Sequence, residues 1–201
     1  MKYFLFDIGN VLTNFTFQKL LQAYADHSGH PLGEQTDRDE EMYLKVETGA
    51  LSEQEYVEYL NEAKGLNWTT DNLHMVWQEM FSLNYDGLGL FKKAKASDAA
   101  VCTLSNIADY HVRAIEHNWN GFFKNVDHLF MSYRMGVRKP DIRIYEMVLE
   151  ELGVPGDHCF FIDDLQVNVE TARSAGFQAH QFVPGTYFEV RQAAAEFFGW
   201  E

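Results

Sequence analysis

Five short apolar runs in this chain alternate with amphipathic helical patterns, and this order limits the folds that the chain can adopt. The runs cover residues 3–6, 99–104, 128–131, 159–162 and 178–182. The helical patterns that separate or follow the later runs cover residues 109–117, 140–152, 168–175 and 188–198. Strands that alternate with helices build βαβ units, so we predict an α/β fold with a mostly parallel, Rossmann-like sheet. Pro140 is expected in the first turn of a helix, and Gly153 just past the end of that helix.

Residues 15–84 break this alternation, because they contain several helical patterns and no convincing strand. The segment Ser52-Glu53-Gln54-Glu55 is a capping box that predicts one helix start, and Thr70-Asp71 predicts another. Apolar residues at helical spacing follow each start, and residues 15–24 and 41–46 supply two further patterns. We therefore predict a helical cap domain at residues 15–84, inserted into an α/β core domain formed by residues 1–14 and 85–201.

The chain is acidic, with 16 Lys and Arg residues against 30 Asp and Glu and a formal net charge of -14. Such a surface repels nucleic acid phosphates and anionic membranes, so we expect neither as a partner. No apolar stretch approaches the roughly 18 residues of a membrane span, and the first apolar run is too short for a signal peptide. Cys102 and Cys159 lie in apolar runs, so we expect buried thiols without a disulfide framework, in a cytoplasmic protein.

Asp7 directly follows the first apolar run, and Gly9-Asn10 after it indicates a tight turn. A carboxylate at this junction would lie at the carboxyl end of a strand, where open α/β sheets bind their ligands. The alternative is an aspartate that caps the turn, and Asp7 alone does not decide between the two.

Polar residues also follow two later elements. Ser105-Asn106 comes after the second strand and before a helix, where a hydroxyl and free amide groups can bind an anion. Arg138-Lys139 precedes another helix start, a position that is mildly unfavourable for a cation, so the pair indicates a role in function. The alternatives are an ordinary helix cap at Ser105-Asn106 and a surface cation at Lys139.

Asp163 and Asp164 follow the fourth apolar run. Two adjacent carboxylates at the end of a buried strand repel each other unless a cation lies between them. Mg²⁺ prefers carboxylate oxygens, so the pair predicts a divalent metal site. The alternative is that the pair caps the next helix.

These features stand in a characteristic order along the chain. An aspartate after the first strand, Ser-Asn after the second, Lys-Pro at a helix start and Asp-Asp after a later strand resemble the haloacid dehalogenase superfamily. The resemblance covers nearly the whole chain, with the helical cap inserted after the first motif. The segments Phe6-Asp7-Ile8-Gly9-Asn10-Val11, Arg138-Lys139-Pro140 and Asp163-Asp164 with Asn168 are similar to sugar-1-phosphate phosphatases and the N-terminal phosphatase domain of soluble epoxide hydrolases.

The resemblance implies a Mg²⁺-dependent phosphohydrolase that acts on a small phosphate ester, such as a sugar phosphate. In the family the first aspartate is the nucleophile, so Asp7 would form an aspartyl-phosphate that water hydrolyses. Mg²⁺ would bind Asp7, the backbone carbonyl of Gly9 and Asp164. Asp163 would hold the waters of the metal.

The resemblance also implies roles for the other polar residues. Lys139 would balance the charge around the phosphoryl group. Ser105, Asn106 and Lys139 would bind the substrate, with Ser105 close to the non-bridging oxygens. Phosphoryl transfer depends chiefly on such positioning and electrostatic stabilisation.

Gly9 departs from the commonest family pattern, which has an aspartate there as general acid for the leaving group. General acid catalysis contributes about 10²–10⁴ in rate, so its loss matters. We hypothesise a substrate that leaves easily, such as an anomeric sugar phosphate or an acyl phosphate. Water, or His27 or His30 of the cap, are the alternative proton sources.

Two other functions stay open at this point. In a metal-free 2-haloacid dehalogenase, the same aspartate attacks carbon and displaces halide. That branch typically has Tyr where this chain has Gly9, and an arginine early in the cap, whereas this chain has no arginine before Arg38. A non-catalytic binding protein is the second alternative, because Gly9 permits it. The acidic cap residues Asp37, Asp39, Glu40 and Glu41 are interpreted as a solvated face rather than as ligands for sugar hydroxyls. Substrate identity and oligomeric state are not encoded in any recognisable pattern.

Overall fold

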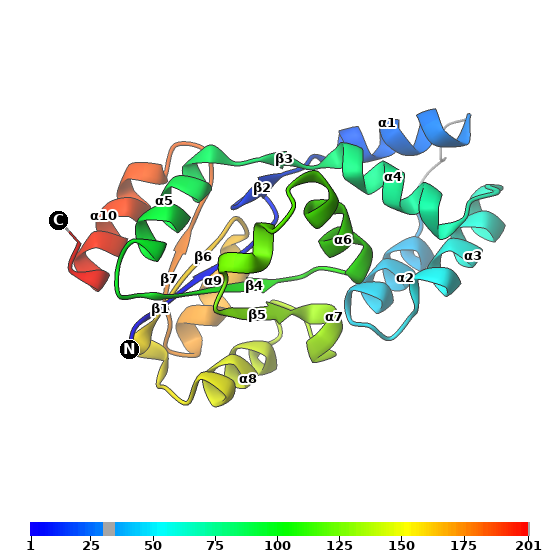
Figure 1. Cartoon of the computed structure of the whole chain (residues 1–201). Coiled ribbons are helices and arrows are strands. Elements are labelled where there is room, and N and C mark those ends of the chain that lie inside the picture. The colour runs from blue at the N-terminus through cyan, green and yellow to red at the C-terminus, as the bar shows by residue number, and fades with distance from the viewer. Residues whose placement is uncertain (30–34, 201) are drawn as a thin grey trace.

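The structure is a computed structural model that describes residues 1–29 and 35–200. Five strands form a parallel sheet in the order β5-β4-β1-β6-β7, with β1 at its centre (Figure 1). Their bounds are Tyr3–Phe6 for β1, Ala100–Ser105 for β4, His128–Met131 for β5, Cys159–Asp163 for β6 and Gln178–Gln181 for β7. All five lie where the apolar runs predict strands, so the α/β prediction is confirmed.

Both faces of the sheet are covered by helices, as alternate side chains of the central strand require. Phe4 and Phe6 pack toward helices α5 (Tyr85–Lys95) and α10 (Tyr187–Phe198). Leu5 packs toward the opposite face. That face is covered by α8 (Ile142–Leu152) and α9 (Gln166–Ser174). The remaining core helices are α6 (Asp109–Asn118), α7 (Ser132–Met135), η1 (Phe122–Asn125) and η2 (Gly156–His158).

Four helices lie together at one end of the molecule and form the cap (Figure 1). They are α1 (Phe17–Ser28), α2 (Asp37–Glu47), α3 (Glu53–Lys64) and α4 (Thr70–Met80). The capping box at Ser52 is present, since its hydroxyl accepts a hydrogen bond from the Glu55 amide and the Glu55 carboxylate accepts one from the Ser52 amide. Aromatic residues of these helices, including the buried Trp77 and Tyr24, pack in an apolar cluster that also includes Tyr110 and Ala114 of α6.

A short antiparallel ribbon, β2 (Thr13–Asn14) with β3 (Ser82–Leu83), connects the cap to the core. The sequence did not predict β3, because a two-residue strand is too short to show a period. The ribbon lies at both boundaries of the predicted insertion, and we propose the division into residues 1–14 with 85–201 and residues 15–84 on that basis. Gly87 in α5 allows the backbone to approach Val11 closely at this junction, since a Cβ atom on residue 87 would lie 1.7 Å from the Val11 carbonyl oxygen.

One predicted helix boundary is wrong. Helix α8 begins at Ile142 with Asp141 as its N-cap, so Pro140 precedes the helix instead of lying in its first turn. The Asp141 carboxylate accepts a hydrogen bond from the Arg143 amide, which fixes the start two residues later than Pro140. Gly153 ends the helix in a left-handed conformation, as predicted. Cys102 and Cys159 are both buried, free thiols. Among the described helices, none has the length and apolar character needed to cross a membrane.

Candidate functional site

Three neighbouring strands bring their carboxyl ends together beside Asp7. Phe6, the last residue of β1, pairs with Thr103 of β4 and with Ile162 of β6. The residues that follow in each strand therefore share one edge of the sheet, and they include Asp7, Ser105 and Asp163. All three are buried. The sequence predicts this convergence, because the ends of parallel strands meet at the same edge.

Lys139 reaches this edge from the loop before α8, and its side chain is fully buried. Its Nζ atom lies 3.0 Å from Asp7 Oδ1 and 2.5 Å from Asp163 Oδ2. The same ammonium group donates a hydrogen bond of 2.8 Å to the Leu104 carbonyl oxygen. Burial disfavours the charged amine, but the two carboxylates outweigh it and raise the pKa of Lys139. Lys139 is therefore an internal cation and not a surface lysine.

Asn106 fixes the main chain at Lys139. Its side-chain Nδ2 donates to the Lys139 carbonyl oxygen at 2.9 Å, and its Oδ1 accepts from the Lys139 amide at 2.8 Å. Neither Ser105 nor Asn106 caps a helix, because α6 begins later, with Ala108 as its N-cap. Ser105 is the last residue of β4 and is buried at the edge of the sheet that it shares with Asp7.

The two carboxylates after β6 have different surroundings. Asp163 is fully buried, and its Oδ1 accepts hydrogen bonds of 2.9 Å from the Leu165 amide and from Asn168 Nδ2. Asp164 lines a cavity, and its Oδ2 accepts a hydrogen bond of 3.0 Å from Asn10 Nδ2. The N-cap of α9 is Leu165, so neither Asp163 nor Asp164 is the N-cap of this helix.

Three carboxylates with one ammonium group leave this site short of positive charge. Oxygen atoms of Asp7, Asp163 and Asp164 lie within 4.8 Å of one another. Burial raises the pKa of Asp7 to about 7, against the opposing effect of Lys139. Burial also raises the pKa of Asp164. A hard divalent cation such as Mg²⁺ fits this donor set, because it would supply the missing charge and favour both carboxylates in their ionised form.

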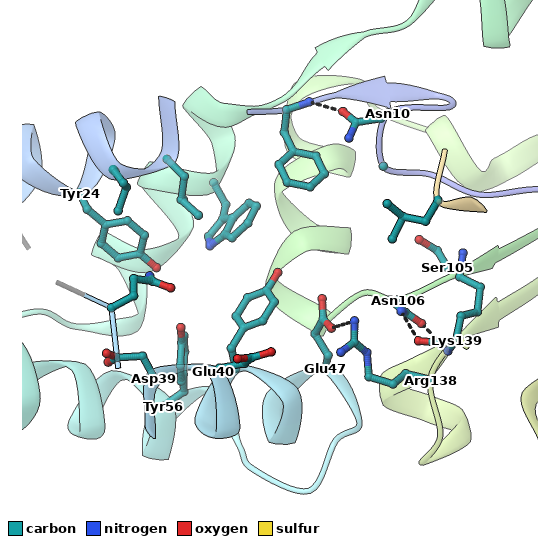
Figure 2. Close-up of a pocket in the computed structure, with 18 of the residues that line it drawn as sticks. Asn10, Tyr24, Asp39, Glu40, Glu47, Tyr56, Ser105, Asn106, Arg138 and Lys139 are labelled. Carbon is teal, nitrogen blue, oxygen red and sulfur yellow. Dashed lines mark hydrogen bonds and ion pairs between the residues drawn. The ribbon is translucent and has the colours of Figure 1, made fainter. Parts of the chain in front are cut away.

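The site opens into a cavity of about 610 Å³ between the core and the cap. Its core end is formed by Asp7, Gly9, Asn10, Ser105, Asn106, Lys139 and Asp164. Figure 2 shows Ser105, Asn106 and Lys139 at this end, and Tyr24, Asp39 and Tyr56 at the other end, beneath the cap helices. All the residues predicted for the site line this cavity except Asp163, which lies behind Lys139.

A family model for haloacid dehalogenase-like hydrolases matches residues 1–176 of the chain. The chain belongs to this family. Because the match extends over most of the sequence, it includes the helical cap, the three strand ends at the site and Lys139.

Two curated relatives of this hydrolase are phosphatases. The D-ribitol-5-phosphate phosphatase of Bacteroides thetaiotaomicron is 25% identical over 194 residues, which cover 90% of this chain and 91% of that protein. The sesquiterpene phosphatase astK of Aspergillus oryzae is 32% identical over 108 residues, or 51% of this chain. The aligned segment is about half (53%) of the length of astK.

A solved structure shares the fold of this hydrolase. It is a HAD family enzyme from Bacteroides thetaiotaomicron in complex with magnesium. The TM-score is 0.81 at 22% sequence identity, over 92% of this chain and 94% of that one. The shared fold therefore comprises both the core and the cap of this hydrolase.

Sequence reasoning missed two polar contacts at the site. Asn10, in a left-handed conformation with φ of 55°, donates to Asp164 and accepts a hydrogen bond from the Phe15 amide at 3.2 Å. Asn tolerates this conformation better than most residues, so Gly9-Asn10 was the available signal. Glu47 of the cap and Arg138 of the core form an ion pair of 3.2 Å, which Figure 2 shows beside the cavity. No signal in the sequence marks that pair, because its partners are distant in the chain.

His27, one of the two histidines considered as proton donors, lies away from the cavity. His27 pairs with Glu79 at 3.4 Å between Nε2 and Oε1, and it does not line the cavity. His30 lies outside the described residues. The structure therefore does not bring His27 to the leaving-group side of the site.

The acidic residues of the cap do not behave as one solvated face. Glu41 is exposed and pairs with Arg38 and Lys45, as a solvated residue would. Asp39 is buried, so that interpretation is wrong for it. Its carboxylate accepts hydrogen bonds from the Thr36 amide and hydroxyl, the Tyr59 hydroxyl and Lys64 Nζ. Although burial acts in the opposite direction, these bonds hold the pKa of Asp39 below its usual range.

Proposed function

We propose that this hydrolase is a Mg²⁺-dependent phosphatase of small phosphate esters, with Asp7 as its nucleophile. The observation that carries the proposal is the placement of the Asp7 carboxylate on the cavity floor, 3.0 Å from the Lys139 ammonium and next to Asp164. Two phosphatases among its relatives support the reaction class.

In the first step, an Asp7 carboxylate oxygen attacks phosphorus and the bond from phosphorus to the leaving-group oxygen breaks. The leaving oxygen takes a proton and departs as the alcohol. In the second step, water attacks the aspartyl-phosphate at phosphorus, which releases inorganic phosphate and restores Asp7. Lys139 balances the charge of the phosphoryl oxygens, and the Ser105 hydroxyl donates a hydrogen bond to one of them.

Mg²⁺ would be held by Asp7, the Gly9 carbonyl and Asp164, with Asp163 acting on its waters. When bound, it would neutralise charge on the phosphoryl group. Asn106 is proposed here as a positioning residue, because both ends of its amide already bind the Lys139 main chain.

A small phosphate ester is the proposed partner, and the names of the two phosphatase relatives, one for ribitol 5-phosphate and one for a sesquiterpene, leave both a polar and an apolar alcohol as its organic part. Gly9 supplies no proton, so a good leaving group or a water molecule would complete the first step. A cytoplasmic location is part of the proposal, and the net charge of -14 supports an enzyme that binds neither nucleic acid nor anionic membranes.

A screen of phosphate esters with and without Mg²⁺ tests the proposal, with Asp7→Asn beside the wild type. We expect Mg²⁺-dependent phosphate release by the wild type and none by the variant. Mass spectrometry of acid-quenched protein should find a phosphoryl adduct on the peptide that contains Asp7. Asp98→Asn is the matched control, because Asp98 is exposed on the core domain. Full activity of Asp7→Asn would show that the nucleophile is wrong.

A further inference from the structure

The cap side of the cavity is mainly apolar and aromatic. The cap residues that supply this surface are Phe15, Leu20, Leu21, Tyr24, Leu60 and Trp77. From the core, Leu165 faces the same cavity with 51% of its surface exposed. Cavities of about 300–1,000 Å³ hold drug-sized ligands. At about 610 Å³, this one has room for an organic group much larger than the phosphate.

Four acids of the cap line the cavity; Asp37 and Glu40 are exposed, and the two buried ones already have partners. Asp39 accepts hydrogen bonds at both carboxylate oxygens, and Glu47 is paired with Arg138. A polyol chain enclosed there would need a hydrogen-bond partner for every hydroxyl, because unpaired buried hydroxyls are costly. Apolar groups need no such partners, so the part of the lining formed by Phe15, Leu21 and Trp77 matches a hydrocarbon better than a sugar.

The apolar surface begins next to the nucleophile. A Cβ atom on Gly9 would come within 3.0 Å of the Phe15 ring. The ring therefore lies beside Gly9, only two residues after Asp7. The Phe15 and Trp77 ring centroids are 6.4 Å apart. The leaving group would therefore pass from the phosphoryl site directly onto aromatic side chains.

We propose that the substrate is a phosphate monoester of a bulky, largely apolar alcohol whose hydrocarbon part lies along Phe15, Leu21 and Trp77. The proposal rests on the phosphatase function proposed above and narrows its substrate class. Hydrolysis of such an ester consumes one water and yields the alcohol and inorganic phosphate.

The test compares n-octyl phosphate with D-ribitol 5-phosphate, because both are esters of primary alcohols and differ in the polarity of the chain. We expect kcat/KM for the octyl ester to be higher by about tenfold or more, since each buried methylene contributes about fourfold in binding. Acetyl phosphate reports on the phosphoryl site separately, because its two-carbon leaving group can bury little of the apolar lining.

Leu21→Gln should lower the ratio of octyl to ribitol activity, since it adds a polar group to a half-buried position in the apolar lining. Leu44→Gln is the matched control, because Leu44 is half-buried in the same cap but does not line the cavity. Its ratio and its acetyl phosphate activity should equal those of the wild type.

Calorimetric binding of n-butyl- and n-octylphosphonate to the wild-type protein with Mg²⁺ tests the apolar lining without turnover. Tighter binding of the longer chain is expected. Turnover of acetyl phosphate with an equal or greater preference for the ribitol ester would overturn the substrate class. Absence of acetyl phosphate turnover would instead overturn the phosphatase proposal. In that case the binding test still applies, and equal affinity for the two phosphonates would show that the cavity does not bind an apolar chain.

Discussion

The ring of Phe15 lies against Gly9, so that a Cβ atom on residue 9 would stand 3.0 Å from Phe15 Cε1. Phe15 is the first residue after the β2 strand, at the entrance to the cap, and its amide is held by Asn10 Oδ1. A cap side chain therefore occupies the space beside the position where the commonest family pattern has a general acid. The absence of an acidic side chain at residue 9 and the position of the Phe15 ring depend on each other, because a larger residue 9 would displace the ring.

An acid at position 9 therefore needs the Phe15 ring to shift or to be removed. We expect Gly9→Asp alone to lower kcat on alkyl phosphates, because the new side chain crowds Phe15. In the Phe15→Ala background, Gly9→Asp should raise kcat on alkyl phosphates, by up to about 10². Steady-state rates of the two single variants and the double variant measure this. The gain should be smaller for acetyl phosphate, whose leaving group needs no proton, and an equal gain on both substrates would exclude general acid catalysis.

Asn106 is expected to act through Lys139. Asn106→Ala removes both hydrogen bonds to the Lys139 main chain, so the ammonium group should lose its fixed position between Asp7 and Asp163. A misplacement of about 1 Å can cost about 10² in rate, and we expect a loss of this order in kcat with little change in KM. Asn120→Ala is the control, because Asn120 is exposed on the core. A rise in KM with unchanged kcat would indicate direct substrate binding by Asn106 instead.

The sequence predicted the parts of the site that follow from strand order. Asp7, Ser105 and Asp163 follow buried apolar runs, and parallel pairing of β1 with β4 and β6 is enough to bring them together. Helix starts in the cap could be predicted where a capping box marked them, as at Ser52. Such features can be predicted because the interactions that produce them are made between residues close together in the sequence.

Contacts between the cap and the core could not be predicted in this way. Glu47 and Arg138 pair only because of how the cap lies over the sheet, and no periodicity or cap motif encodes that. The same holds for Asp39, which looks like one of several surface acids in sequence but is buried with Lys64 and Tyr59 around it. The proposed positioning role of Asn106 depends on the hydrogen bonds of its side-chain amide with the Lys139 main chain, and local sequence does not specify that partner.

Lys139 should matter for stability as well as for catalysis. Lys139→Met leaves buried carboxylates without their cation, and breaking a buried ion pair in this way costs about 3–5 kcal/mol. Urea unfolding without Mg²⁺ measures the loss. Mg²⁺ should recover more stability in this variant than in the wild type, because the metal would replace the missing charge. Lys92→Met, at an exposed position of α5, should change neither quantity.

Removal of the metal distinguishes this hydrolase from a metal-free dehalogenase. EDTA should abolish phosphate release, and Mg²⁺ should restore it, because a cation would offset the repulsion among the neighbouring carboxylates of Asp7, Asp163 and Asp164 and the phosphoryl group. The protein should release no chloride from 2-chloropropionate. Chloride release that persists in EDTA would reverse the assignment of the reaction class.

His111 should make the stability of the protein depend on pH. It is buried, and burial lowers its pKa to about 3, while its Nδ1 accepts a hydrogen bond of 3.1 Å from the Ala108 amide. An unfolded histidine has a pKa of about 6.5, so between these values the unfolded chain binds a proton that the folded chain does not. Stability should therefore fall as the pH decreases through this window, by at most about 1.4 kcal/mol per pH unit from this residue.

The measurement is the difference in unfolding free energy between the wild type and His111→Gln at several pH values. Gln cannot be protonated, so this difference should shrink steadily below pH 6.5 if His111 remains neutral in the folded protein. Trp77 contributes to this burial, since the ring centroids of His111 and Trp77 are 3.9 Å apart where α6 packs against the cap. A difference that stays constant from pH 7 to pH 4 would show that His111 is not desolvated there, and that water reaches this part of the junction between cap and core.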